Sequence, residues 1–153
     1  MKEIYSIFVK FLDLSQMQRR TLISALLLLP VFWLALRMLG LARFHANLKR
    51  RPILATVLVP ISVIRTVGLA VNIAARHTPF PATCLTRSLL LGWLLRRRGV
   101  PSDLRIGVRL AKGVLDAHAW VECGGVPVND SLDVGSQFAA FSDLVPSKAS
   151  SAS

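Results

Sequence analysis

The first half of the chain has the polarity pattern of helices. Residues 1–50 are expected to be helical, and the run from Thr21 to Leu36 carries no charge over 16 residues. A transmembrane helix needs about 20 apolar residues, and Pro30 interrupts this run. We therefore expect a helix packed on protein, and a surface-bound amphipathic helix or a membrane span remains as an alternative.

A second helix is predicted between two prolines. Pro60 can occupy its first turn, and the helix should end near Arg76-His77 because Pro79 cannot continue it. Apolar residues recur along it at helical intervals: Ile61, Ile64, Val67, Val71 and Ala74/Ala75.

A third helix is predicted from Cys84 to Arg98, after the stiff connector Pro79-Phe80-Pro81. Thr83 is its expected N-cap, and Gly99 has the position of a residue that ends a helix. Its expected buried stripe consists of Leu85, Leu89, Trp93 and Leu94.

Beyond Pro101 the period changes from helical to alternating. Strands are predicted at 104–110, 117–123 and 126–129, with turns at 111–113 and Gly124-Gly125. Helices followed by an antiparallel sheet indicate an α+β fold. The predicted division is a basic, apolar helical region over 1–58, a catalytic domain over 59–146 and a disordered tail over 147–153.

Charge is spread unevenly. The net charge is +11, and residues 1–78 hold 11 Lys or Arg against only Glu3 and Asp13. Such a basic half suits an acidic partner such as nucleic acid, an anionic membrane surface or an acidic peptide. A solvated basic rim would have the same composition.

Cysteine usage and motifs narrow the chemistry. The two cysteines, Cys84 and Cys123, allow one disulfide at most, and nothing resembles a cleaved signal peptide. We expect a cytoplasmic protein, with membrane contact as a less favoured alternative. No metal-ligand spacing and no phosphate-binding glycine loop is present, so neither a metal nor a cofactor is expected.

Cys84 is the candidate nucleophile. Unpaired N–H groups at a helix start and a nearby imidazolium both favour the reactive thiolate. The same N–H groups can face a developing oxyanion. The alternative is a buried structural cysteine, which is the expectation for Cys123 on the opposite face of its strand from His118.

His118, in the predicted strand Ala117–Cys123, is the candidate general base and acid. His45, in an Arg-rich helical stretch, and His77, at a helix end, are weaker candidates. Asp130 would orient the imidazole, with Asp116 and Asp133 as competitors.

Strand register makes the role of Asp130 conditional. A two-residue loop at Gly124-Gly125 pairs Asp130 with Ala119 and puts it on the face opposite His118. A longer loop or one bulge would put Asp130 and His118 on one face. The triad hypothesis thus predicts an irregular hairpin, and a plain two-residue turn would remove Asp130 from it.

Four ordered blocks resemble one known family: Pro81–Leu89, Leu95–Val108, His118–Glu122 and Val128–Asp130. It is the B-protein leader peptidase of lasso peptide biosynthesis, a transglutaminase-like cysteine protease, and the resemblance covers roughly residues 60–140. It implies a papain/transglutaminase-like fold, in which a nucleophile helix packs on a small antiparallel sheet. The implied roles are nucleophile for Cys84, general base and acid for His118 and orienting residue for Asp130.

The resemblance also implies a substrate and partners. The family cuts the leader from a ribosomally made precursor peptide, and a separate cyclase closes the macrolactam. The sequence before Cys84 leaves no room for the family's leader-recognition module, so the split form with a stand-alone recognition protein is expected. Papain-type enzymes place a glutamine before the cysteine, and none is so placed here. Backbone N–H groups, including that of Cys84, are the expected oxyanion donors.

Two other functions fit parts of the sequence. The same fold can transfer an acyl group to an amine, as a transglutaminase or amidase. A non-catalytic scaffold bound to membrane or nucleic acid would use the basic N-terminal half, but it would not need a cysteine at a helix start matched to His118 and Asp130. Nucleic acid is not an expected partner of the peptidase.

Overall fold

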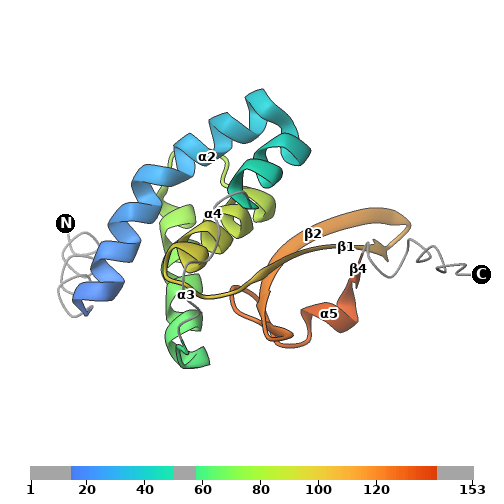
Figure 1. Cartoon of the computed structure of the whole chain (residues 1–153). Helices are drawn as coiled ribbons and strands as arrows, with labels where there is room; N and C mark the ends of the chain where they lie inside the picture. The colour runs from blue at the N-terminus through green and yellow to red at the C-terminus, as the bar shows by residue number, and fades with distance from the viewer. Residues whose placement is uncertain (1–14, 50–57, 141–153) are drawn as a thin grey trace, which may run out of the picture.

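The computed structural model describes residues 15–49 and 58–140 (Figure 1). Three long helices come first and a small sheet follows, so the predicted α+β class is confirmed. The elements in chain order are α2 (Gln16–Lys49), α3 (Ile61–His77), α4 (Cys84–Arg97), β1 (Asp103–Ala111), β2 (Val114–Cys123), β3 (Val126–Pro127), α5 (Val134–Gln137) and β4 (Ala139–Ala140).

Helix α2 is long, apolar and bent. It bends at Gly40, whose φ of 72° and ψ of 162° interrupt the helical backbone. One face is buried in the core shared with α3 and α4, and includes Leu22, Ala25, Leu29 and Phe32. The expected packing on protein is thus found for this face. By length and composition the segment Gln16–Ala46 could cross a membrane, and only 22% of its most apolar window is buried inside the protein.

Helix α3 begins after Pro60 and ends at His77, as predicted. Its buried positions are Ile64, Val67, Gly68, Ala70, Val71 and Ala74. Ile61, which was expected in this stripe, is 42% exposed.

Helix α4 is the centre of the fold, between the other helices and the sheet (Figure 1). Thr83 caps it, since its Oγ1 accepts the N–H of Thr86 at 3.2 Å. Gly99 follows its end with φ of 74°, as expected of a helix-terminating glycine. Neighbours cover more of the surface than a single stripe, and the buried leucines are Leu89, Leu90, Leu91, Leu94 and Leu95. Leu85 and Trp93 are only half-buried.

The sheet is antiparallel with strand order β3-β2-β1-β4. Strand β2 has two different faces. Val121 and Cys123 belong to the core shared with the helices, whereas Trp120 joins Val134 and Phe138 in a second cluster on the other side. Residues 133–140 were not assigned any element from sequence. They include α5 and β4: β4 extends the sheet as the edge strand beside β1, and Val134 and Phe138 pack on Trp120 at this second face.

Capping by Thr83 gives a direct test of how α4 begins. We expect Thr83→Ala to lower the free energy of unfolding by about 1 kcal/mol, because the N–H of Thr86 loses its acceptor. Thr66→Ala is the matched control, since Thr66 Oγ1 bonds only to the Ser62 carbonyl one turn back in α3. Chemical denaturation measures both. An equal loss in the two variants would contradict a capping role.

Candidate active site

The structure brings two of the three predicted site residues into contact. The Nε2 atom of His118, in the middle of β2, lies 2.6 Å from Oδ2 of Asp130. Cys84 is the first residue of α4 and a half-buried free thiol. Among the described residues, the thiol makes no hydrogen bond to His118. Because Nε2 is engaged by Asp130, Nδ1 is the ring nitrogen left to exchange a proton with a thiol.

The predicted hairpin irregularity is wrong. Gly124 and Gly125 form a plain two-residue turn with φ of 57° and 80°, and the register pairs Glu122 with Pro127 and Cys123 with Val126. The inference that Asp130 would then face away from His118 is also wrong. It assumed that the strand continues to residue 130, but β3 ends at Pro127 and the chain leaves the ladder after Val128.

Asn129 is the residue that ends the ladder. The last regular rung is the Val128 N–H bond to the Val121 carbonyl, at 3.0 Å. The N–H of Val121 then donates to the side chain of Asn129, to Oδ1 at 2.8 Å, instead of to a strand carbonyl. This substitution of side chain for backbone frees the following residue from strand alternation. Asp130 can therefore turn toward His118.

The same side chain ties this bend to the nucleophile helix. Asn129 Nδ2 donates to Ser88 Oγ at 3.1 Å, and Ser88 Oγ donates to the carbonyl of Ala119 at 3.0 Å. Ser88 is 1% exposed and lies one helical turn after Cys84, and Ala119 is next to His118. The buried Ser88 and the partly buried Asn129 thus fix α4, β2 and the approach to Asp130 in one arrangement.

Helix α3 holds the bend from the other side. Asn72 Nδ2 donates to the Asn129 carbonyl at 2.8 Å, and Arg87 Nη1 reaches Asn72 Oδ1 at 3.4 Å. Arg65 Nη1 donates to the Pro127 carbonyl at 3.3 Å. The segment before Asp130 is therefore held through its backbone carbonyls as well as through Asn129.

Gly68 lets α3 approach this segment closely. A Cβ added to Gly68 would lie 2.2 Å from the carbonyl oxygen of Val128, a distance that real Cβ atoms do not reach. Only glycine fits here, because the obstacle is backbone and cannot rotate away. The helix thus sets the position of the residues that lead into Asp130.

Aromatic rings support the His118 side chain. The rings of Phe138 and Trp120 have their centroids 5.0 Å and 6.2 Å from that of the imidazole. Trp120 is 1% exposed, and its Nε1 donates to Glu122, which is also paired with Arg105. Gly107 pairs with His118 across the sheet and makes room for this cluster, since an added Cβ would approach Phe138 and Trp120 to about 3 Å.

The competing candidates are engaged elsewhere. Asp116 pairs with Arg109 at 2.9 Å, and Asp133 accepts from Gln137 at 2.7 Å. His77 bonds to the carbonyl of Ile73 at the end of α3, as expected for a helix-end histidine. His45 lies on α2 beside a small pocket.

Cys123 is a buried core residue, as predicted, and both cysteines are free. Burial raises the pKa of the Cys123 thiol to about 11, and the charge of Asp103 adds to the shift. A thiol in this setting is a poor nucleophile at neutral pH. Cys84 is thus the better-placed of the two thiols for nucleophilic chemistry.

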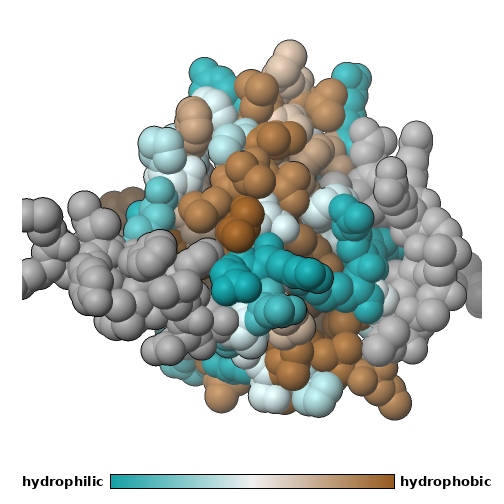
Figure 2. All heavy atoms as spheres, turned by 90° about the vertical axis from the view of Figure 1, so that its left-hand side faces the viewer, coloured by the Kyte–Doolittle hydropathy of each residue, from teal (hydrophilic) through white to brown (hydrophobic). Residues whose placement is uncertain are grey.

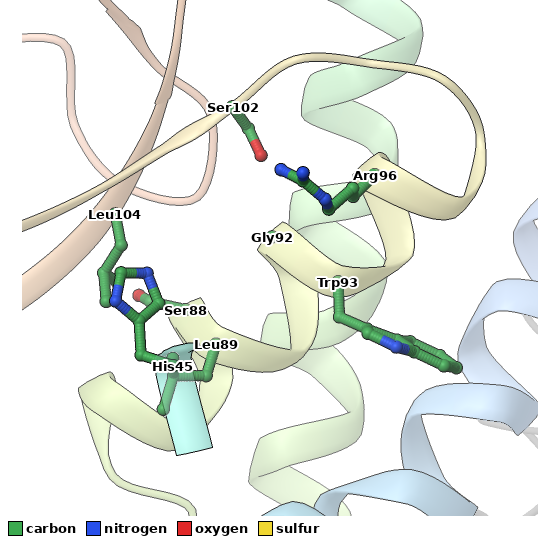
Figure 3. A pocket seen from close by; sticks show the side chains of 8 residues that line it. All are labelled: His45, Ser88, Leu89, Gly92, Trp93, Arg96, Ser102 and Leu104. Atoms are coloured by element: carbon green, nitrogen blue, oxygen red, sulfur yellow. The ribbon is translucent and has the colours of Figure 1, made fainter. Parts of the chain in front are cut away.

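Two cavities lie near the site. A shallow groove of about 410 Å³ runs between α3 and the bend, and Arg65, Leu69 and Asp130 are among its lining residues. A second pocket of about 40 Å³ runs along α4 between Ser88 and Ser102, with His45 at one end and Arg96 pointing toward Ser102 (Figure 3). The second has room for a few water molecules only. The groove is large enough for part of a peptide.

The side chains of the site determine which reactions it could catalyse. An imidazole oriented by a carboxylate can move a proton, and a free cysteine at a helix start is suited to nucleophilic attack. Within the described ranges, no three His, Cys, Asp or Glu side chains gather in a way that could hold a metal ion.

Sequence reasoning missed Asn129, Ser88 and Asn72. A serine within a leucine-rich helix is the available signal, because a buried hydroxyl needs a partner. The spacing of residues along the sequence does not show how α4 lies on β2, so it could not identify Asn129 as the partner of this serine.

Comparison with known proteins places this chain in a family. A family model described as the transglutaminase-like superfamily matches residues 25–143. Over 65 residues the chain is 32% identical to the microcin J25-processing protein McjB of Escherichia coli, and this match covers 42% of the chain but only 30% of that relative. No solved structure matched.

The close contact between Gly68 and Val128 predicts that replacing Gly68 by alanine destabilises the protein, the opposite of the usual effect of this substitution in a helix. Glycine to alanine within a helix ordinarily stabilises by up to about 1 kcal/mol. We expect Gly68→Ala instead to lower the free energy of unfolding by about 1–3 kcal/mol, since backbone must shift. Gly92→Ala in α4 is the control, because its Cβ would meet only Ser102 Oγ at 3.9 Å. Denaturant unfolding of both variants decides the matter, and an unchanged or more stable Gly68→Ala protein would refute the close contact.

The two thiols should differ in reactivity. At pH 8 a thiol with a pKa of about 11 is thiolate in roughly one molecule in a thousand. We expect iodoacetamide to label Cys84 of the folded protein and leave Cys123 unlabelled, as read by peptide mass spectrometry. Both should react in denaturant. Equal labelling of Cys123 in the folded state would show that it is not the buried thiol described here.

Proposed function

Because the chain belongs to the transglutaminase-like superfamily, we propose that it is a cysteine peptidase that removes the leader from a lasso peptide precursor. The observation that carries the proposal is the His118–Asp130 pair, held through Asn129 and Ser88 to the helix that begins with Cys84. The similarity to McjB, a protein named for microcin J25 processing, supports peptide maturation as the setting.

The proposed reaction begins with the thiol of Cys84. His118 takes its proton, and the sulfur attacks the carbonyl carbon of the bond between leader and core. The carbon–nitrogen bond breaks as His118 returns the proton to the leaving amine. Water, activated by His118, then hydrolyses the thioester and regenerates the thiol. The N–H groups at the start of α4, including that of Cys84, stabilise the oxyanion.

Asp130 acts on this reaction through His118. It bonds Nε2, fixes the tautomer that leaves Nδ1 facing the reaction and stabilises the imidazolium. The thiol and imidazole come into hydrogen-bond contact when substrate binds, because catalytic hydrogen bonds are commonly long in the free enzyme and shorten in the complex.

Substrate recognition is shared in this proposal. The groove beside Asp130 holds residues near the cleaved bond, and a stand-alone leader-recognition protein presents the precursor. The lasso cyclase acts on the product and is a further candidate partner. In this proposal the peptidase domain comprises residues 59–146 and is preceded by an N-terminal region over residues 1–58, whose described helix α2 packs against α3 and α4.

Leader removal should depend on Cys84 and Asp130. We expect Cys84→Ala to abolish cleavage of a precursor peptide encoded beside this protein, assayed with the adjacent recognition protein, whereas Cys123→Ala retains it. Asp130→Asn should lower kcat about tenfold or more, and the nearby exposed Asp133→Asn should leave kcat unchanged.

Product masses report on the reaction type. Water addition with leader release is the expected product, whereas ammonia loss with crosslinking would indicate acyl transfer to an amine instead. Retained cleavage in Cys84→Ala would sink the proposal.

A further inference from the structure

The outer face of α2 carries an apolar stripe. Five residues on the side away from the core are 45–76% exposed: Ile23, Leu27, Val31, Leu34 and Met38. Their spacing of four, four, three and four residues places them in one row, roughly 22 Å long at the rise of an α-helix. Figure 2 shows apolar surface running across the side of the molecule where α2 lies, with hydrophilic residues beside it.

This stripe is unusual because the opposite side of the same helix is also apolar and packs in the protein core. Leu22, Ala25, Leu29 and Phe32 fill the core, so α2 is apolar on both sides. Single exposed apolar residues are common on protein surfaces, but a continuous row of five marks a surface that something covers.

The charges around the stripe indicate which kind of partner would cover it. From residue 14 to residue 102 the sequence has no Asp or Glu, and it has 13 Lys or Arg: Arg19, Arg20, Arg37, Arg43, Lys49, Arg50, Arg51, Arg65, Arg76, Arg87, Arg96, Arg97 and Arg98. Arg20 continues the row at its N-terminal end, three residues before Ile23. The helical half of the molecule is therefore complementary to a negatively charged partner.

Aromatic residues lie at the other end of the stripe. The guanidinium of Arg37 lies 5.8 Å from the ring centroid of Trp33, which in turn lies 5.9 Å from the ring of Phe80. Phe80 is 43% exposed and precedes Cys84 by four residues. Tryptophan beside arginine is typical of segments at the boundary between lipid tails and headgroups.

We propose that the outer face of α2 lies flat on an anionic lipid surface, with the apolar stripe among the acyl chains and the arginines at the headgroups. A span is disfavoured because the inner face of the helix is buried against α3 and α4. A second copy is disfavoured because each chain carries a net charge of +11, with no Asp or Glu from residue 14 to residue 102.

Vesicle co-sedimentation of the purified full-length chain tests this proposal. We expect binding to phosphatidylcholine vesicles that contain 30% phosphatidylglycerol, and at least tenfold weaker binding to phosphatidylcholine alone. The double variant Leu27→Gln, Val31→Gln should bind the anionic vesicles at least tenfold more weakly than wild type. The matched control is Val114→Gln, Leu115→Gln, which alters two equally exposed apolar residues at the β1–β2 hairpin and should bind like wild type.

Three outcomes overturn the proposal. Wild type that does not bind anionic vesicles at low salt has no such surface. Binding that the Leu27/Val31 variant retains in full is electrostatic only and does not use the stripe. Self-association of the wild type that this variant loses, measured by light scattering without vesicles, assigns the face to a protein contact. Circular dichroism of each variant confirms that the fold is intact.

Discussion

The arrangement of the site depends on how the side chain of Asn129 ends one strand. A backbone N–H that has lost its strand partner is costly to leave unsatisfied, and the Oδ1 of Asn129 accepts that of Val121. Because an amide has both an acceptor and a donor, its Nδ2 is free to bond Ser88 on α4. The chain can therefore leave the sheet one residue before Asp130 without an unpaired group, and Asp130 meets His118.

This constraint connects parts of the fold that are far apart in sequence. Ser88 extends the link to the Ala119 carbonyl, and Asn72 of α3 holds the carbonyl of Asn129. Gly68 then sets how closely α3 lies against the bend. The helices and the sheet hence share one polar junction, located between the nucleophile helix and the His–Asp pair, while leucines fill the space around it. Charge is divided along the same line, since the acids of the described residues all lie in the sheet half.

Local patterns predicted the elements well and the junction poorly. Apolar spacing, Pro60 and the Thr83 cap gave α3 and α4 nearly to the residue, because each signal acts within a turn or two of chain. The two-residue turn at Gly124-Gly125 was also visible, yet the conclusion drawn from it about Asp130 failed. Strand alternation holds only while the ladder continues, and the side chain of Asn129 ends it by accepting the Val121 N–H. That side chain is held in place by Ser88, which is 41 residues away in the sequence. The short elements α5 and β4 likewise depend on packing and not on a local pattern.

The candidate residues themselves could be chosen from sequence because their chemistry is carried by residue type and by position at a helix start or in a strand. The distances between these residues could not be predicted from the sequence.

The central claim is that His118 acts on Cys84, although no hydrogen bond joins them among the described residues of the free protein. The rate of Cys84 alkylation by iodoacetamide at pH 7 tests this claim without a substrate. We predict a rate at least tenfold lower in His118→Ala than in wild type, with equal rates for the two proteins in denaturant. Equal rates in the folded state would mean that the two residues do not form one site.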